Sequence, residues 1–439
     1  MQHTYLRYEC ADAFSLTTST ASSTAPPTTS TLAFLGSSPA APLLSNAASQ
    51  IIGFNLRSLA PCIKIAHRDS PSGGVGSGRA LNGDEVTCLD VCRSSAGDGS
   101  EGDCKVATGW SDGTVRIFDL SSSEVAAAAA ASSSSSSASS NLGLVHSLLH
   151  ADEGGAGAEE FVTREPLVLN GHGSSPVRCV VFDRSGSALG GAAATRLASG
   201  GSDGAVVVWD IVAETGLFRL LGHRSAVTDI SFIRPGLGSG VQATASNLAS
   251  TFDGLVTSSA EGLVKVWDLD GQCCVQTIAN HRGEVSCSAA VRLGGSLSPA
   301  EADDASSDEG RWRLVTGCAD GAVRVWSVTK PKRIEEDQDM DEENDAIGDD
   351  DAAAATSAAA ATSTDQDDAC HFIGTLSPPP NVATSNEKVA SIHFHPNGRY
   401  VGVCRTNGKT IAVYHVRNEA EAQRKKTRRM RRRREKGGK

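Results

Sequence analysis

The chain lacks any Cys-x-x-Cys pair, although it has twelve cysteines among its 439 residues. Closely spaced ligand pairs are typical of structural zinc sites, so the cysteine pattern argues against a metal centre. Several cysteines lie in strand-like runs, where a reduced thiol packs as a small apolar group. Unpaired thiols of this kind indicate a reducing compartment.

The chain also lacks an apolar run long enough to span a bilayer and a charged-then-apolar N-terminal signal. Its glycine-rich stretch 73–78 has no following lysine, which a phosphate-binding loop requires, so we interpret it as a linker. We therefore expect no membrane contact, no small-molecule substrate, no cofactor, no metal and no enzymatic activity.

What the sequence contains instead is a repeat. Four stretches, 112–119, 203–210, 261–268 and 320–327, begin with an acidic residue and glycine and continue into Val, Ile, Phe or Trp. The acidic-glycine pair favours a tight turn between two strands, because glycine accepts a positive φ angle. The run that follows has strong strand preference and is too short for a helix. Repeated units of this kind normally present a binding surface.

Two weaker units flank these four. Strand-like runs at 51–56 and 62–66 predict a degenerate first unit, and 389–394, 395–400 and 410–414 predict the strand, turn and closing strand of a sixth. Three units also open with Gly-His or Asn-His, at His172, His223 and His281.

At the Gly-His, Ser/Thr, Asp-Gly and Trp-Asp positions the chain resembles the WD-repeat family. That resemblance implies an all-β fold, a WD40-type β-propeller with four antiparallel strands per blade, and about six of seven blades present. It also implies a polar network inside each of three blades. The residues of these networks are His172, Ser199, Asp203 and Trp209; His223, Thr257, Glu261 and Trp267; and His281, Thr316, Asp320 and Trp326.

The unit before these three departs from the pattern. It keeps Thr108 and Asp112, has Phe118 in place of Trp, and has no matching His. The His/Ser/Asp sets could be mistaken for hydrolase triads. We prefer a structural role, because they recur in several units whereas a catalytic triad occurs once, and because buried polar groups need internal partners.

Low-complexity segments lengthen the repeat. We predict a propeller over residues 1–416, with disordered insertions at 15–50, 121–160, 296–310 and 331–369. Such segments cannot bury enough apolar surface to offset the entropy of ordering. The acidic stretch 335–351 is interpreted as a solvated spacer, with mimicry of nucleic acid as the alternative.

The charge is polarised along the chain. The net charge is −11, yet 424–434 holds nine basic side chains among eleven residues, within a predicted basic helical tail at 417–439. Basic runs contact phosphate backbones or serve as nuclear import signals, and the alternative is a solvated tail with no specific partner. The candidate contact residues are Arg424, Lys425, Lys426, Arg428, Arg429, Arg431, Arg432, Arg433 and Arg434.

Three segments, 5–16, 216–230 and 264–274, narrow the resemblance. They are similar to the WD-repeat U3 small nucleolar RNA-associated proteins of the UtpB subcomplex (the WD repeat-containing protein three family). This resemblance implies a non-catalytic scaffold of the small-subunit processome in the nucleus and nucleolus. It would support U3 snoRNA-dependent pre-rRNA processing and 18S rRNA maturation. Its partners would be other processome WD-repeat subunits, U3 snoRNA and pre-rRNA, the RNAs through backbone contacts.

Family members are about twice this length, so the resemblance implies that a last blade, a second propeller and a C-terminal helical domain are missing here. We therefore expect a fragment or a truncated gene model. The alternative function is a WD-repeat substrate-recognition adaptor in a ubiquitin ligase or chromatin complex, because WD repeats alone do not define a function.

Overall fold

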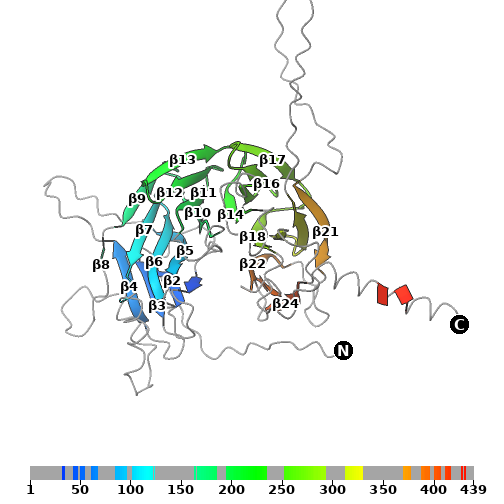
Figure 1. The fold of residues 1–439 in the computed structure, drawn as a ribbon, viewed down its shortest axis with the longest axis horizontal. Coiled ribbons are helices and arrows are strands. Elements are labelled where there is room, and N and C mark those ends of the chain that lie inside the picture. Colours follow the sequence, from blue (N-terminus) through cyan, green and yellow to red (C-terminus); the bar gives the residue numbers. More distant parts are fainter. Residues whose placement is uncertain are drawn as a thin grey trace, which may run out of the picture.

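In a computed structural model of the chain, the regular elements among the described residues are almost all β-strands (Figure 1). The residues that it describes are 32–34, 43–47, 50–54, 61–67, 85–95, 101–121, 123, 163–164, 166–184, 194–234, 252–292, 312–329, 369–376, 387–395, 400–406, 411–416, 427–428 and 430–431.

The strands form six sheets. The first sheet contains β1 (Leu32–Phe34), β2 (Leu43–Ala47), β3 (Gln50–Phe54), β4 (Pro61–His67) and β8 (Thr163–Arg164). The second contains β5 (Val86–Ser95), β6 (Glu101–Trp110), β7 (Thr114–Leu120) and β9 (Leu167–Asn170). The third contains β10 (Val177–Phe182), β11 (Arg196–Gly201), β12 (Val206–Asp210) and β13 (Thr215–Leu220).

The remaining three sheets follow the same antiparallel order. The fourth sheet contains β14 (Val227–Ile233), β15 (Gly254–Ser259), β16 (Val264–Asp268) and β17 (Cys273–Ile278). The fifth contains β18 (Val285–Arg292), β19 (Trp312–Cys318), β20 (Val323–Val328) and β21 (Cys370–Leu376). The sixth contains β22 (Val389–Phe394), β23 (Tyr400–Arg405) and β24 (Ala412–His415).

The acidic-glycine pairs form the turns between the second and third strands of four sheets. Gly113, Gly204, Gly262 and Gly321 all have positive φ angles there, between 75° and 86°. A side chain at Gly204 would also meet the backbone carbonyl of His223, at 2.6 Å from the added Cβ. Glycine is therefore required at position 204 for two reasons. Its φ angle is positive, and the loop that leads to the next sheet lies too close to leave room for a side chain.

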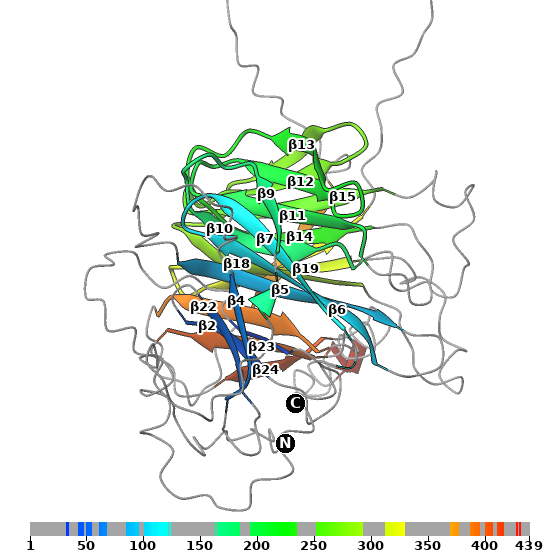
Figure 2. The same cartoon turned by 90° about the vertical axis from the view of Figure 1, so that its left-hand side faces the viewer.

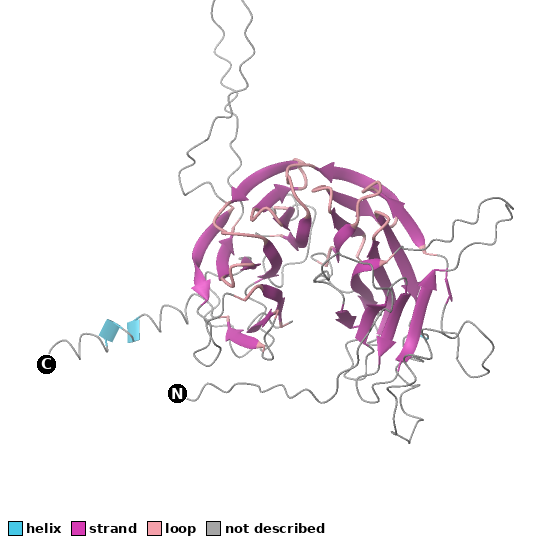
Figure 3. Cartoon of the chain, turned by 180° about the vertical axis from the view of Figure 1, so that it is seen from behind, coloured by secondary structure: helices cyan, strands magenta, loops and turns pink. Residues whose placement is uncertain are grey.

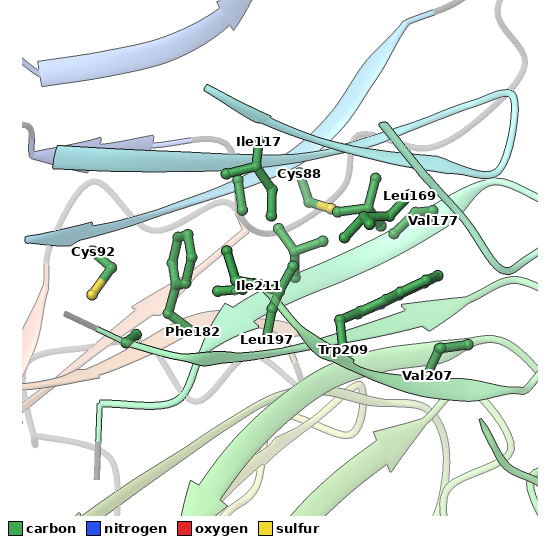
Figure 4. Close-up of a cluster of buried hydrophobic side chains, with 14 residues drawn as sticks. Cys88, Cys92, Ile117, Leu169, Val177, Phe182, Leu197, Val207, Trp209 and Ile211 are labelled. Carbon is green, nitrogen blue, oxygen red and sulfur yellow. The ribbon is translucent and has the colours of Figure 1, made fainter. Parts of the chain in front are cut away.

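The six sheets succeed one another in chain order around a common centre (Figures 1 and 2). Each of the second to fifth sheets buries one face against the sheet before it and the other against the sheet after it. Figure 4 shows this for the second and third sheets, where Cys88, Ile117 and Leu169 face Leu197 and Trp209. The all-β propeller predicted from the repeat is therefore confirmed.

Neighbouring sheets are also joined by a recurring hydrogen bond near the start of the innermost strands. The Thr87 hydroxyl donates to the carbonyl of Val177 at 2.5 Å, and the Thr228 hydroxyl donates to that of Val285 at 2.5 Å. The Ser286 hydroxyl does the same to Val389 at 2.5 Å.

The other two junctions use different donors for the same kind of acceptor. The Asn46 amide donates to the carbonyl of Val86 at 2.6 Å. The thiol of Cys179 lies 4.0 Å from the carbonyl oxygen of Val227. In the third sheet the position after the first valine is Arg178, which has no hydroxyl, so only the weak thiol donor is available.

The first sheet corrects one expectation. Strands β1 and β2 lie inside 15–50, which the sequence predicted to be a disordered insertion. They are ordered by pairing with β3, because Leu44 and Ile51 bury their side chains against the second sheet. The other predicted insertions, 121–160, 296–310 and 331–369, lie almost wholly outside the described residues.

The C-terminal prediction lies almost wholly outside the described residues. The basic helix predicted for 417–439 is not shown as an element. Only 427–428 and 430–431 are described there, as two short helical pieces (Figure 3). The sixth sheet has three strands in the described part of the chain, whereas the four sheets before it have four. The domain limits 1–416 and 417–439 stay predictions.

Candidate functional site

The third sheet brings its four predicted polar residues into one hydrogen-bonded chain. The Trp209 indole N–H donates to the Ser199 hydroxyl at 2.9 Å, and that hydroxyl lies 2.8 Å from Nε2 of His172. Nδ1 of His172 lies 3.2 Å from Oδ1 of Asp203. Because the carboxylate can only accept, Nδ1 carries the ring proton, and the Ser199 hydroxyl therefore donates to Nε2.

The fourth sheet repeats the chain with a longer acid. Trp267 donates to the Thr257 hydroxyl at 2.8 Å, which lies 2.7 Å from Nε2 of His223. The Glu261 carboxylate lies 2.9 Å from Nδ1 of His223 and also accepts the Arg224 amide at 3.3 Å.

The fifth sheet completes only half of the chain. Trp326 donates to the Thr316 hydroxyl at 3.1 Å, and Nε2 of His281 lies 2.8 Å from that hydroxyl. Nδ1 of His281 is buried and has no hydrogen-bond partner among the described residues. Asp320 instead pairs with Arg324 at 3.0 Å.

The residue two positions after the buried hydroxyl explains these differences. It is Gly201 in the third sheet, where an added Cβ would lie 2.5 Å from Nδ1 of His172 and closer still to Asp203. Glycine is therefore what allows the short Asp203 to reach the histidine. The equivalent residue of the fourth sheet is Ser259, and there the longer Glu261 makes the contact. In the fifth sheet it is Cys318, whose thiol donates to the carbonyl of Gly283 at 3.5 Å.

The second sheet has a tryptophan at the same position, and its unit has no matching histidine. Here the residue is Trp110, and its indole N–H donates to the Thr108 hydroxyl at 2.9 Å. The guanidinium of Arg116 lies 3.9 Å from the centroid of the Trp110 ring and pairs with Asp112 at 2.7 Å. Phe118, which stands where the other sheets have Trp, is a buried apolar residue. Our sequence reasoning missed Trp110; its spacing from Thr108 is the signal that could have identified it.

Each acidic turn residue except that of the fourth sheet also has a basic partner. Arg116 and Arg324 come from the position four residues after the acid. In the third sheet that position is Val207, and Arg219, directly opposite Val207 on β13, reaches Asp203 at 2.6 Å instead. In the fourth sheet Lys265 turns away to the Thr277 hydroxyl at 2.9 Å, which leaves Glu261 to its histidine.

Burial keeps the histidines neutral. It lowers the pKa of His172 and of His223 below the usual range, although Asp203 and Glu261 oppose the shift. It lowers the pKa of His281 to about 4, and here the charge of Arg324 acts in the same direction. The neutral ring is the form that the proton order of the network requires.

The buried hydroxyls are out of reach of any substrate. Ser199, Thr257 and Thr316 each have 0% exposure, and each hydroxyl is engaged by both a tryptophan and a histidine. A nucleophile must be able to touch the reacting atom. The chemistry that this arrangement supports is therefore internal cross-linking of strands and loops.

The tail bases are mostly outside the described residues. Arg428 and Arg431 are described and exposed, whereas Arg424, Lys425, Lys426, Arg429 and 432–434 are not described. Within the described ranges, no set of three or more His, Cys, Asp or Glu side chains is placed to hold a metal ion. Among those same residues, no helix has the length and apolar character needed to cross a membrane.

Two stretches of the chain match a known family, described as WD domain, G-beta repeat. They are residues 164–210 and 272–327, which include the networks of the third and fifth sheets in large part. The chain therefore carries WD40 repeats, and its six sheets form a WD40-type β-propeller. Proteins with such repeats generally act as non-catalytic interaction scaffolds.

Two curated proteins are similar to parts of the chain. Nuclear distribution protein PAC1 of Arthroderma otae is 32% identical over 134 residues, which are 30% of this chain and 24% of that protein. U3 small nucleolar RNA-associated protein 12 of Saccharomyces cerevisiae is 26% identical over 117 residues, 20% of this chain and 12% of that protein. The matched part thus spans less than two thirds of the length of either relative.

Among solved structures, the computationally designed Ika8 protein covers 88% of this chain and 70% of its own. The identity is 16% and the TM-score is 0.42, which is too low to bear on fold or function.

Proposed function

We propose that this chain is a non-catalytic scaffold of the small-subunit processome. It would support U3 snoRNA-dependent pre-rRNA processing and 18S rRNA maturation by binding protein partners and RNA backbone, and it would reside in the nucleus and nucleolus. The observation that carries the scaffold role is the inward-facing polar network, whose hydroxyls have 0% exposure. The His, Ser/Thr and acidic side chains of the networks bond to one another and hold strands and loops together. The other loops and the outer surface can then bind partners.

The ribosome-biogenesis part of the proposal rests on sequence. One similar protein is U3 small nucleolar RNA-associated protein 12. The segments 5–16, 216–230 and 264–274 also resemble U3 small nucleolar RNA-associated proteins. The basic run 424–434 supplies positive charge suited to an RNA backbone. It contains no aromatic residue, so its binding would be electrostatic and would not discriminate between bases.

The experiment is a pull-down of the tagged full chain, followed by RNA sequencing and identification of the bound proteins. We expect enrichment of U3 snoRNA, pre-rRNA and processome WD-repeat subunits, with nucleolar localisation. Recovery of ubiquitin-ligase or chromatin components without U3 snoRNA would overturn the proposal in favour of a substrate-recognition adaptor.

The tail is tested by two matched variants. Replacing all nine basic residues of 424–434 with Gln removes the charge, whereas replacing only its arginines with Lys keeps it. We expect the Gln variant to retain less RNA and to show a weaker dependence of binding on salt, because fewer counterions are released. The Lys variant should bind as the unchanged chain does. Equal RNA retention by both variants would contradict a role for the tail.

A further inference from the structure

The sixth sheet, which ends the succession of sheets in Figure 1, has one buried face and one exposed face. On β24, Ala412 is buried, whereas its neighbours Ile411 and Val413 are 42% and 45% exposed. On β23, Val401 is 2% exposed, whereas Tyr400 beside it is 44% exposed. Successive side chains of a strand point to opposite faces of the sheet, so this alternation separates the two faces.

The buried face packs against the fifth sheet. Val401 and Ile392 share an apolar cluster with Val315 and Val323 of that sheet. Within the described residues, no buried apolar cluster joins the sixth sheet to the first. The other face of the sixth sheet therefore has no apolar packing partner in the described part of the chain.

The exposed side chains form one surface, which we call the open face. The register places Tyr400 opposite His415 and Gly402 opposite Val413. The rings of Tyr400 and His415 meet edge to face with their centroids 5.3 Å apart, and an added Cβ at Gly402 would lie 3.6 Å from Ile411. The residues of the open face are Ser391, His393, His395, Tyr400, Gly402, Cys404, Ile411, Val413 and His415.

The third sheet shows what covers such a face inside the propeller. Its Val206 and Val208 hold the positions that Ile411 and Val413 hold in the sixth sheet. Both valines are 0% exposed, because they lie in a cluster shared with Ile230 of the fourth sheet. The partner at these positions is thus another β-sheet with an apolar face, and the same kind of partner fits the open face.

A second copy of the chain carries a matching sheet face. The open face contains no Asp, Glu, Lys or Arg. A two-fold axis brings the same patch of two subunits together, so a charged patch would repel itself, whereas an uncharged apolar patch does not. Other exposed apolar residues, such as Val168, Leu217 and Phe372, lie on the outermost strands of separate sheets. The best-matched surface on the described part of the chain is therefore the open face itself.

We propose that the open face binds the open face of a second copy, so that the two sixth sheets pack face to face about a two-fold axis. Burial of Tyr400, Ile411 and Val413 in both copies drives the contact, and the closed symmetry limits the assembly to a dimer. One face of a three-stranded sheet is a small interface, for which we expect a dissociation constant in the micromolar range. This pairing goes beyond the proposed scaffold role and does not depend on RNA.

The test is analytical ultracentrifugation of the full chain after nuclease treatment, over a concentration series across the micromolar range. We expect a monomer–dimer equilibrium that tightens as salt is raised, because each chain has a net charge of −11 and salt screens their repulsion. A chain that stays monomeric throughout this range would overturn the proposal, and so would open-ended growth into larger species. Neither result bears on the scaffold role, which the pull-down tests.

A charge on the open face should weaken the dimer. Val413→Lys should raise the dissociation constant at least about tenfold, because a charge that loses water without gaining a partner opposes association. Leu217→Lys is the matched control, since Leu217 is also 45% exposed but lies on β13 of the third sheet. It should dimerise as the unchanged chain does. Equal weakening in both variants, or in neither, contradicts the proposal.

A mixture of Val413→Lys and Val413→Glu tests the two-fold arrangement. Unlike charges then lie in the same small interface, so the mixed dimer should form at least about tenfold more tightly than the dimer of either variant alone. A mixture that associates no better than its components counts against face-to-face pairing. If the Val413 variants do not fold, Ile411→Lys and Ile411→Glu replace them, because Ile411 lies on the same face with 42% exposure.

Discussion

In the second sheet the indole of Trp110 donates to the buried hydroxyl of Thr108, the bond that Trp209 on the next strand makes to Ser199 in the third sheet. This unit has Phe118 where the others have tryptophan, and Trp110, two residues after Thr108, supplies the missing donor to the hydroxyl.

We predict that Trp110→Phe lowers the free energy of unfolding by about 1–2 kcal/mol, because the Thr108 hydroxyl loses its donor while the ring volume is largely kept. Trp312→Phe is the matched control. Nε1 of Trp312 is buried without a partner among the described residues, so its removal should cost less. Urea unfolding of both variants measures the difference, and equal losses would argue against the role of the indole bond.

Gly201 provides the second prediction at this scale. Gly201→Ala places a methyl group against His172 and Asp203 and should separate them, at a cost of about 1–3 kcal/mol in the free energy of unfolding. Gly374→Ala is the control, because nothing lies within 4 Å of the added Cβ there. Thermal unfolding compares the two; a Gly201→Ala protein as stable as the Gly374→Ala protein contradicts the explanation.

At the level of elements, the innermost strands are what hold successive sheets together. The carbonyl of the first valine of each of these strands accepts a hydrogen bond from the sheet before it. In three junctions the donor is a Thr or Ser hydroxyl, on the residue that follows the first valine of the innermost strand in that earlier sheet. Apolar contacts are not directional, so these hydrogen bonds help to fix how far one sheet slides over the next.

We predict that Thr228→Val, which keeps the shape of the side chain and removes the hydroxyl, lowers the free energy of unfolding by about 1 kcal/mol. It should also increase hydrogen exchange at the start of β18. Thr277→Val is the control, because that exposed hydroxyl on β17 bonds only the side chains of Lys265 and Cys274. The same loss in both variants would show that the junction bond contributes nothing specific.

The sequence predicted strands where local pattern and turn chemistry agree. The acidic-glycine turns and their Val-rich strands are visible in any single unit, because glycine's positive φ and β-branched residues are local properties. Strands β1 and β2 were missed because the surrounding Ser, Thr, Ala and Pro residues suggest disorder, whereas their order depends on pairing with β3. The parallel pairing of β8 with β4 is likewise a long-range contact without a local signal.

The polar networks show the same limit at the scale of the whole molecule. Spacing and resemblance placed the histidine, hydroxyl, acid and tryptophan of each unit together. They did not reveal that Nδ1 of His281 has no partner among the described residues, since Asp320 pairs with Arg324 instead. Nor did they reveal that a cysteine lies opposite a glycine at one position of the second, third and fifth sheets, whereas the fourth sheet has Asp229 opposite Ser258 there.

The stability of the whole propeller should depend on two opposing sets of titrating groups. Asp229 favours folding more as the pH falls from about 7 towards 4, since its pKa is raised in the folded state. The buried histidines act in the opposite direction. Their pKa values are lowered by burial, so their stabilisation is present above about pH 6.5 and is lost as the pH falls.

His281 allows the second contribution to be isolated, because its pKa of about 4 is the most displaced of the three. Relative to His281→Gln, the unchanged chain should lose about 2–3 kcal/mol of unfolding free energy between pH 7 and pH 4.5. Urea unfolding at several pH values measures this difference, with the exposed His415→Gln as the control. Parallel curves for the chain and His281→Gln would mean that the ring is already protonated or solvated in the folded state. Curves of unfolding free energy that converge as the pH falls would assign the loss of stability in acid to His281, because Asp229 is present in both proteins. The fifth sheet keeps this histidine neutral without a carboxylate partner.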